Sequence, residues 1–98
     1  SRHRKDARFM RWIATYTESA RRDLLRIERK TARNIVLKIR AYAMHGNPLR
    51  FAKKLKPPFD ELYRFRIGEY RAIFEVDKRR EIKVLLILRI KHRRDVYE

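Results

Sequence analysis

Apolar residues in the first half of the chain recur at the spacing of α-helices. A short helix is predicted after Thr17, whose hydroxyl can act as its N-cap. Its apolar face consists of Ala20, Leu24 and Ile27. A longer helix is predicted after a second candidate cap, Thr31, and ends before Gly46 and Pro48, which favour a helix stop. Its stripe comprises Ala32, Ile35, Val36, Ile39, Tyr42 and Ala43. Such stripes are nearly always core, so the pattern predicts an αα hairpin packed on another layer.

The rest of the chain has the pattern of β-strands. The predicted strands are residues 10–16, 62–67, 70–76 and 81–90. The first is rich in aromatic and β-branched residues, the next two alternate apolar and polar positions around a turn at Gly68 and Glu69, and the last contains the continuous run VLLIL. That run is typical of a strand covered on both faces. Residues 49–58, LRFAKKLKPP, indicate a basic loop.

These elements predict one α+β domain. We expect an antiparallel sheet made from an N-terminal strand and a C-terminal three-strand meander, with the αα hairpin packed on one face. A chain of 98 residues can bury one modest core, so a single domain over residues 10–98 is expected. Residues 1–9 are basic and precede Met10, a candidate native start. We expect them to be a disordered extension or a remnant of expression engineering.

Charge narrows the range of partners. The chain has 28 Lys and Arg against 12 Asp and Glu, a formal net charge of +16, and no carboxylate lies between Glu28 and Asp60. So large an excess on so small a body favours a polyanion, and nucleic acid is the commonest one. A membrane surface fits less well, because a lipid-binding helix needs a broad apolar face. A strongly acidic protein remains a second kind of partner.

Several other chemistries are not indicated. The chain has no Cys, which leaves neither a disulfide nor a thiolate metal site and fits a reducing compartment, so we expect a cytoplasmic protein. His3, His45 and His92 lack the spacing of metal ligands. No run spans a bilayer, and no signal peptide, phosphate-binding glycine loop or nucleophile elbow is present. We therefore expect no metal and no small-molecule cofactor.

Three arginines lie within the predicted hairpin LYRFRIGEYRAIFEV, residues 62–76. Residues two apart in a strand share a face, so Arg64 and Arg66 point away from Tyr63, Phe65 and Ile67. If the neighbouring strand places Tyr70, Ala72, Phe74 and Val76 toward the core, Arg71 joins the first two arginines. Each guanidinium is shaped for bidentate contact with phosphate oxygens. A merely solvated face is the plainer interpretation, and this pattern alone does not separate a nucleic-acid binder from an enzyme.

The C-terminal segment KHRRDVYE adds two groups that can move protons. His92 offers an imidazole that can accept or donate a proton, and Tyr97 offers a phenol that can stack on a base or transfer a proton. Because this segment directly follows the buried strand, we expect it to lie beside the hairpin.

Two motifs together resemble a known family. LYRFRIGEYRAIFEVD followed by VLLILRIKHRRDVYE is similar to the RelE branch of the RelE/ParE toxin superfamily, whose members commonly read close to LYRLRVGDYRVIYEID and VLRVGHRREVY. The start MRWIATYTESARRDLLRIE and the helix ending in GNPL follow the family order, so the resemblance covers about Met10 to Tyr97. It implies a toxin that an antitoxin neutralises. In RelE-type members it also implies metal-independent cleavage of mRNA in the ribosomal A site.

The resemblance also implies roles for five residues. Arg64 and Arg66 stand where well-studied members have lysines, and Arg71 matches an arginine that contacts the scissile phosphate. Tyr97 matches a tyrosine linked to stacking or proton transfer, and His92 matches the histidine of the GHRR variant. In the family reaction the 2′-OH attacks the adjacent phosphate, which requires a base, cations and an acid. Arginine is a poor base, so proton transfer is expected from His92, Tyr97 or a lysine.

The flanking cations complete the expected interface. Predicted RNA-binding residues are Lys53, Lys54, Lys56, Arg89, Lys91, Arg93 and Arg94, of which Lys91 replaces the glycine usual before HRR. Expected partners are a cognate antitoxin, the ribosome and mRNA, and no membrane. Two alternatives stay open: a ParE-type inhibitor of DNA gyrase, and a basic RNA-binding domain without catalysis.

Overall fold

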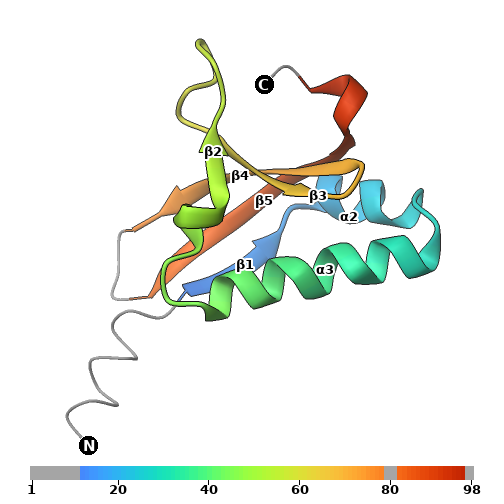
Figure 1. Ribbon diagram of the computed structural model, residues 1–98, viewed down its shortest axis with the longest axis horizontal. Helices are drawn as coiled ribbons and strands as arrows, with labels where there is room; N and C mark the ends of the chain where they lie inside the picture. The colour runs from blue at the N-terminus through green and yellow to red at the C-terminus, as the bar shows by residue number, and fades with distance from the viewer. Residues whose placement is uncertain (1–11, 79–81, 97–98) are drawn as a thin grey trace, which may run out of the picture.

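The computed structural model describes residues 12–78 and 82–96 and shows an α+β domain built on one five-stranded sheet (Figure 1). The elements are β1 (Trp12–Tyr16), α2 (Glu18–Leu25), α3 (Arg29–Met44), η1 (Pro48–Phe51), β2 (Ala52–Lys54), β3 (Tyr63–Ile67), β4 (Tyr70–Asp77), β5 (Lys83–His92) and η2 (Arg93–Asp95). Both α-helices lie on one side of the sheet, while the β2–β3 loop and η2 rise on the other side (Figure 1). The predicted fold class and the helix pair on one face are confirmed.

The sheet differs from the prediction in two pairings. Its strand order is β1-β5-β4-β3-β2, and β1 pairs with β5 in parallel, so the sheet is mixed. Antiparallel pairing holds for β2 through β5. The expected basic loop also contains β2, a strand of three residues that pairs with β3. Strand patterns locate strands but do not choose neighbours, because pairing depends on contacts that are distant in sequence.

The helix boundaries follow local capping chemistry. Thr17 caps α2 as predicted, since its Oγ1 accepts a hydrogen bond from Ala20 N at 3.1 Å. The predicted cap at Thr31 is wrong, because α3 begins at Arg29, three residues earlier than expected, and is capped by Glu28. Glu28 Oε1 accepts hydrogen bonds from both the backbone N and the hydroxyl of Thr31, each at 3.0 Å. These bonds lower the pKa of Glu28; the bond from the backbone N–H of Thr31 has the larger effect and the bond from its hydroxyl the smaller one. The predicted stop is confirmed, with Gly46 at φ +106°.

The core lies between the helices and the sheet and contains a run of stacked rings. Phe65 and Phe74 are fully buried with ring centroids 4.4 Å apart, and Tyr42 of α3 packs 4.7 Å from Phe65. Tyr63 continues the run at 5.6 Å from Phe74, and Phe51 covers Tyr42 at 4.7 Å. This packing confirms that Tyr63 and Phe65 face the helices and leaves the residues between them for the opposite face, here called the open face. Across the two described ranges, no helix combines the length and apolar character required to cross a bilayer.

Candidate nucleic-acid interface

Three cations from three neighbouring strands form a row across the open face. Arg66 of β3 lies directly opposite Arg71 of β4, and Arg71 lies opposite Lys91 of β5. Directly opposed residues in an antiparallel pair project to the same face. The predicted grouping of Arg66 with Arg71 is confirmed, and Lys91 extends it. We call Arg66, Arg71 and Lys91 the cationic row.

A second row lies beside the first. Lys53 is opposite Arg64, Arg64 is opposite Ile73, and Ile73 is opposite Arg89. Ile73 is only 7% exposed although it belongs to the open face, so the long side chains around it cover this part of the sheet. Arg64 is half-buried and shares its face with Arg66, as predicted. The two rows give the hairpin end of the open face a dense positive charge.

Arg71 is held firmly by the β3–β4 turn. The residue is 4% exposed, and its Nη1 donates hydrogen bonds to the carbonyl oxygens of Gly68 at 3.0 Å and Tyr70 at 2.9 Å. Gly68 has φ +59°, a left-handed conformation that glycine adopts without strain. Arg71 is therefore not simply a polar residue on a solvated face of the sheet. Arg66, by contrast, is exposed, so the row combines a fixed cation with an accessible one.

Arg89, a predicted RNA contact, forms an ion pair with a carboxylate. Its Nε and Nη2 donate to the two oxygens of Asp23 in α2, at 2.7 and 3.0 Å, and Ile90 N donates to Asp23 Oδ2 at 2.8 Å. β1 ends at Tyr16 beside Ile87, so Asp23 occupies the edge of β5 that β1 leaves open. Arg89 therefore helps to hold α2 against β5, and its contact with RNA stays a prediction.

The electrostatics of Asp23 follow from these contacts. Asp23 is 8% exposed, and burial by itself acts to raise the pKa of its carboxyl group. The bonds from Arg89 and Ile90 and the charges of Arg89 and Lys91 outweigh burial, so the pKa lies below its usual value. The side-chain hydrogen bond between Arg89 and Asp23 raises the pKa of Arg89. Sequence reasoning missed Asp23, although its position three residues after Ala20 and four before Ile27 places it on the apolar stripe.

His92 lies beside the hairpin but not on the arginine face. It is opposite Tyr70, whose ring it meets edge-on at 5.4 Å, and strand alternation therefore puts it on the side of the sheet opposite to Lys91. Its Nδ1 accepts a hydrogen bond from Arg94 N at 3.2 Å. Tyr97 lies outside the described residues.

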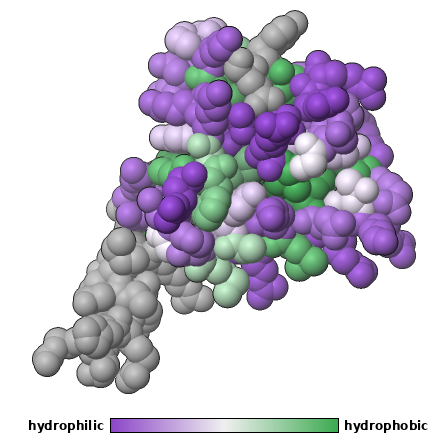
Figure 2. Space-filling model, in the orientation of Figure 1, coloured by the Kyte–Doolittle hydropathy of each residue, from purple (hydrophilic) through white to green (hydrophobic). Residues whose placement is uncertain are grey.

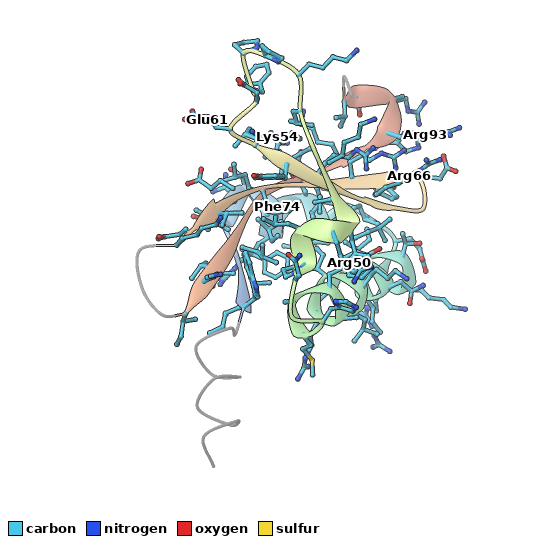
Figure 3. The ribbon with its side chains drawn as sticks, turned by 60° about the vertical axis from the view of Figure 1, so that its left-hand side comes forward. Arg50, Lys54, Glu61, Arg66, Phe74 and Arg93 are labelled. Carbon is cyan, nitrogen blue, oxygen red and sulfur yellow. The ribbon has the colours of Figure 1, made fainter. Side chains whose placement is uncertain are left out.

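The remaining predicted contacts surround the cationic row. Arg93 Nε is 3.0 Å from Glu69 Oε1, and Arg93 N donates to Glu69 O at 2.8 Å, which ties η2 to the β3–β4 turn. Figure 3 labels Arg93 and Arg66 at the same end of the sheet, near the β3–β4 turn. Arg94 is exposed. Lys54 is opposite Tyr63, which places it on the helix side of the sheet, whereas Lys56 is exposed in the β2–β3 loop.

The opposite end of the open face carries two carboxylates beside Lys78. Glu75 and Asp77 lie across from Leu86 and Val84, and they border a hollow of about 570 Å³. Hydrophilic side chains dominate the upper part of the surface, over the β2–β3 loop and η2 (Figure 2). No group of three metal-ligating side chains occurs within residues 12–78 and 82–96. The cationic rows therefore favour binding of a polyanion at the hairpin end of the open face.

Comparison with known proteins assigns the chain to a family. Residues 14–97 match the family model described as the ParE toxin of the type II toxin-antitoxin system, parDE. No curated protein sequence matches the chain significantly. The chain is similar to the RelBE2 toxin-antitoxin complex from Mycobacterium tuberculosis, at 27% identity and a TM-score of 0.66, over 85% of this chain and 99% of that chain.

Two archaeal complexes share the fold at lower identity. These are the RelB-RelE complex from Methanococcus jannaschii (22% identity, TM-score 0.56, 82% of this chain and 91% of that chain) and the RelE-RelB complex from Pyrococcus horikoshii (21%, 0.57, 86% and 96%). The predicted resemblance to the RelE/ParE superfamily is confirmed. Because the family model covers most of its length, the chain belongs to the ParE toxin family of type II toxin-antitoxin systems, within the RelE/ParE superfamily.

Proposed function

We propose that this toxin is a ribosome-dependent mRNA endoribonuclease whose cationic row binds the scissile phosphate. The observation that supports this most is the direct opposition of Arg66 and Arg71. Like charges that face each other across a strand pair destabilise a sheet, and an anion bound between them would relieve that repulsion. A phosphate accepts hydrogen bonds from two guanidinium groups at once, so it fits this arrangement well.

The proposed reaction is attack of a 2′-OH on the adjacent phosphate, which gives a 2′,3′-cyclic phosphate and releases a 5′-OH. Negative charge develops on the phosphate oxygens in the transition state, and fixed cations stabilise it without reorganising. Arg71 is already anchored by Gly68 and Tyr70, so it suits this role. Arg66 and Arg64 add charge from the neighbouring strand.

Proton transfer is assigned first to Lys91. It shares the cationic row with Arg71 and, unlike arginine, can give up a proton at moderate cost. We propose that its ammonium protonates the leaving 5′ oxygen. His92 lies on the other side of the sheet, so a role in accepting the 2′-OH proton requires η2 to reposition it. Tyr97 is the second candidate for that base.

An acidic antitoxin is the proposed protein partner. The M. tuberculosis, M. jannaschii and P. horikoshii relatives are described as toxin–antitoxin complexes. A chain with a formal charge of +16 repels itself strongly, and a segment rich in Asp and Glu over the cationic row would both block RNA and offset that repulsion.

One alternative has specific support. The matching family model is described by the name ParE, and inhibition of DNA gyrase requires no catalytic groups. A basic RNA-binding domain without catalysis is the third candidate, and the net charge alone permits it.

Programmed ribosomes test the proposal. We expect the wild type to cut mRNA only when ribosomes are present, and Arg66→Ala to slow cutting by about 10²–10³-fold, the usual cost of removing one transition-state donor. Arg66 is exposed, so this variant should fold normally. Arg40→Ala is the matched control, because Arg40 is exposed on α3, on the helix side of the sheet. Intact mRNA together with blocked gyrase supercoiling would establish the ParE alternative instead.

A further inference from the structure

The β2–β3 loop carries an exposed aromatic ring that the proposed chemistry does not use. Phe59 is 60% exposed, whereas Phe65 and Phe74 are fully buried in the core and Phe51 is stacked on Tyr42 at 4.7 Å. A phenylalanine ring left in water forgoes about 1.5–3 kcal/mol of burial free energy. Among the phenylalanines that the structure describes, Phe59 alone leaves most of its surface available to a ligand.

The backbone around Phe59 is organised rather than loose. Phe59 N donates to Lys56 O at 2.9 Å, and Phe59 O accepts from Leu62 N at 2.9 Å. Leu55 N donates to Leu62 O at 3.0 Å, which closes the loop at its base and continues the β2–β3 pairing. Two consecutive turns therefore hold both backbone groups of Phe59. A ring displayed from a fixed backbone loses little conformational entropy when it binds.

The loop stands on the open-face side of the sheet. Figures 1 and 3 both show it rising away from the helices, on the same side as η2. Lys53 and Lys54 of β2 and Lys56 of the loop precede the tip in the chain, and all three are exposed. Lys53 belongs to the open face through its pairing with Arg64, so positive charge runs from the loop onto the sheet.

Of the two acidic residues in the loop, Asp60 directly follows Phe59 and is exposed, whereas Glu61 lies toward the far end of the sheet. Glu61 borders a hollow with Glu75 and Lys78. In Figure 3, Glu61 projects on the side of the loop away from Arg66 and Arg93. Glu61 therefore lies apart from the cationic residues at the hairpin end of the sheet.

We propose that Phe59 is a stacking platform for a base of single-stranded RNA whose phosphates lie on the cationic row. This inference rests on RNA being the ligand of the proposed function and adds a base-binding site to it. Base–aromatic stacking needs only a π-face, so it tolerates any sequence. Phosphates alone would leave the strand able to slide along the rows, and a stacked base would fix its register.

Direct binding without ribosomes tests the platform. We would titrate a fluorescein-labelled oligo(A) carrying 2′-O-methyl groups, which cannot be cleaved by 2′-OH attack, and follow fluorescence anisotropy. Phe59→Ala should raise Kd about tenfold or more, and Phe59→Trp should restore binding and show quenching of its indole fluorescence. Phe59→Leu should resemble Phe59→Ala, because leucine is apolar but has no π-face.

Two controls separate stacking from charge. An abasic oligomer of the same length keeps the phosphates, so wild type and Phe59→Ala should bind it equally. Lys56→Ala should reduce the slope of log K against log salt, whereas Phe59→Ala should leave that slope unchanged. Met44→Ala removes an apolar side chain that is 75% exposed on α3 and should have no effect.

The refuting results are equally definite. Wild-type affinity for oligo(A) in Phe59→Ala or Phe59→Leu, or no binding of oligo(A) by the wild type, would overturn the platform. If either variant keeps wild-type affinity, the exposed Phe59 ring would instead be assigned to a protein contact, such as one with the antitoxin. The binding assay contains no ribosome and no cleavable bond, so it is independent of the cleavage assay. If the wild type binds oligo(A) through Phe59 but does not cut mRNA on ribosomes, only the nuclease proposal is refuted.

Discussion

The carboxylate of Asp23 offers the sharpest test of how the fold supports the cationic row. It accepts hydrogen bonds from Ile90 N and from the guanidinium of Arg89, directly before Lys91 in the chain. Asp23→Ala removes all of these bonds. Asp23→Asn removes the charge but keeps an oxygen that can accept from Ile90 N. Comparison of the two variants separates the backbone contact from the ion pair.

The magnitude follows from burial. Ile90 is 4% exposed, and a buried N–H left without an acceptor costs about 1–3 kcal/mol. The Arg89 side chain is 45% exposed, so water can take over its hydrogen bonds, and the pair itself contributes at most about 1 kcal/mol. Asp23→Ala should therefore lower the free energy of unfolding by about 2–4 kcal/mol, and Asp23→Asn by about 1 kcal/mol. For a domain of this size the larger loss lowers Tm by about 10 °C or more.

Urea unfolding followed by tryptophan fluorescence measures this directly, because Trp12 is the single tryptophan and is buried. The pKa of Asp23 is lowered in the folded state. Its contribution is therefore present above the unfolded pKa of about 3.9 and is lost as pH falls through the lower folded value. The gap between wild type and Asp23→Asn should stay constant from about pH 5 to 7 and close below about pH 4.

Glu18→Gln is the matched control in the same helix. Glu18 pairs with Arg22 at 3.2 Å, but both side chains are largely exposed, so the change should stay within about 0.5 kcal/mol. Equal losses in Asp23→Ala and Asp23→Asn would refute the importance of the Ile90 bond. A loss in Asp23→Ala no larger than that in Glu18→Gln would refute the whole account of the β5 edge.

Three further predictions concern local stability and titration. Thr17→Ala removes the cap on Ala20 N and the bond from Thr17 Oγ1 to Leu88 O, so urea unfolding should show a loss of about 1–2 kcal/mol that Thr17→Ser largely recovers; no recovery would implicate the methyl group instead. Gly68→Ala forces a side chain into φ +59° with no atom within 4 Å, so a loss of about 1 kcal/mol without steric damage is expected, and a loss above about 3 kcal/mol would contradict it. Burial raises the pKa of Tyr16 to about 12, because the phenolate is disfavoured away from water. A spectrophotometric titration should contain a late tyrosine step that disappears in Tyr16→Phe, and an unchanged curve would contradict that burial.

Local patterns in the sequence predicted much of this structure. The cap at Thr17, the helix stop at Gly46 and the inward faces of Tyr63 and Phe65 depend on groups only a few residues apart, and all were predicted correctly. Arg66 and Arg71 share a face for the same reason, since the period of a strand and a tight turn fix their register. The wrong cap at Thr31 shows where such local prediction fails. Glu28 has a side chain long enough to cap the same helix from three residues earlier.

Only the tertiary structure decided which distant groups meet. The parallel contact of β1 with β5 joins segments separated by most of the chain, and it leaves the β5 edge that Asp23 fills. Folding also pairs Arg89 with Asp23 and places Lys91 opposite Arg71. The family resemblance suggested which residues matter. Which of these charged residues forms an ion pair depends on long-range packing, because partners such as Arg89 and Asp23 are far apart in the sequence.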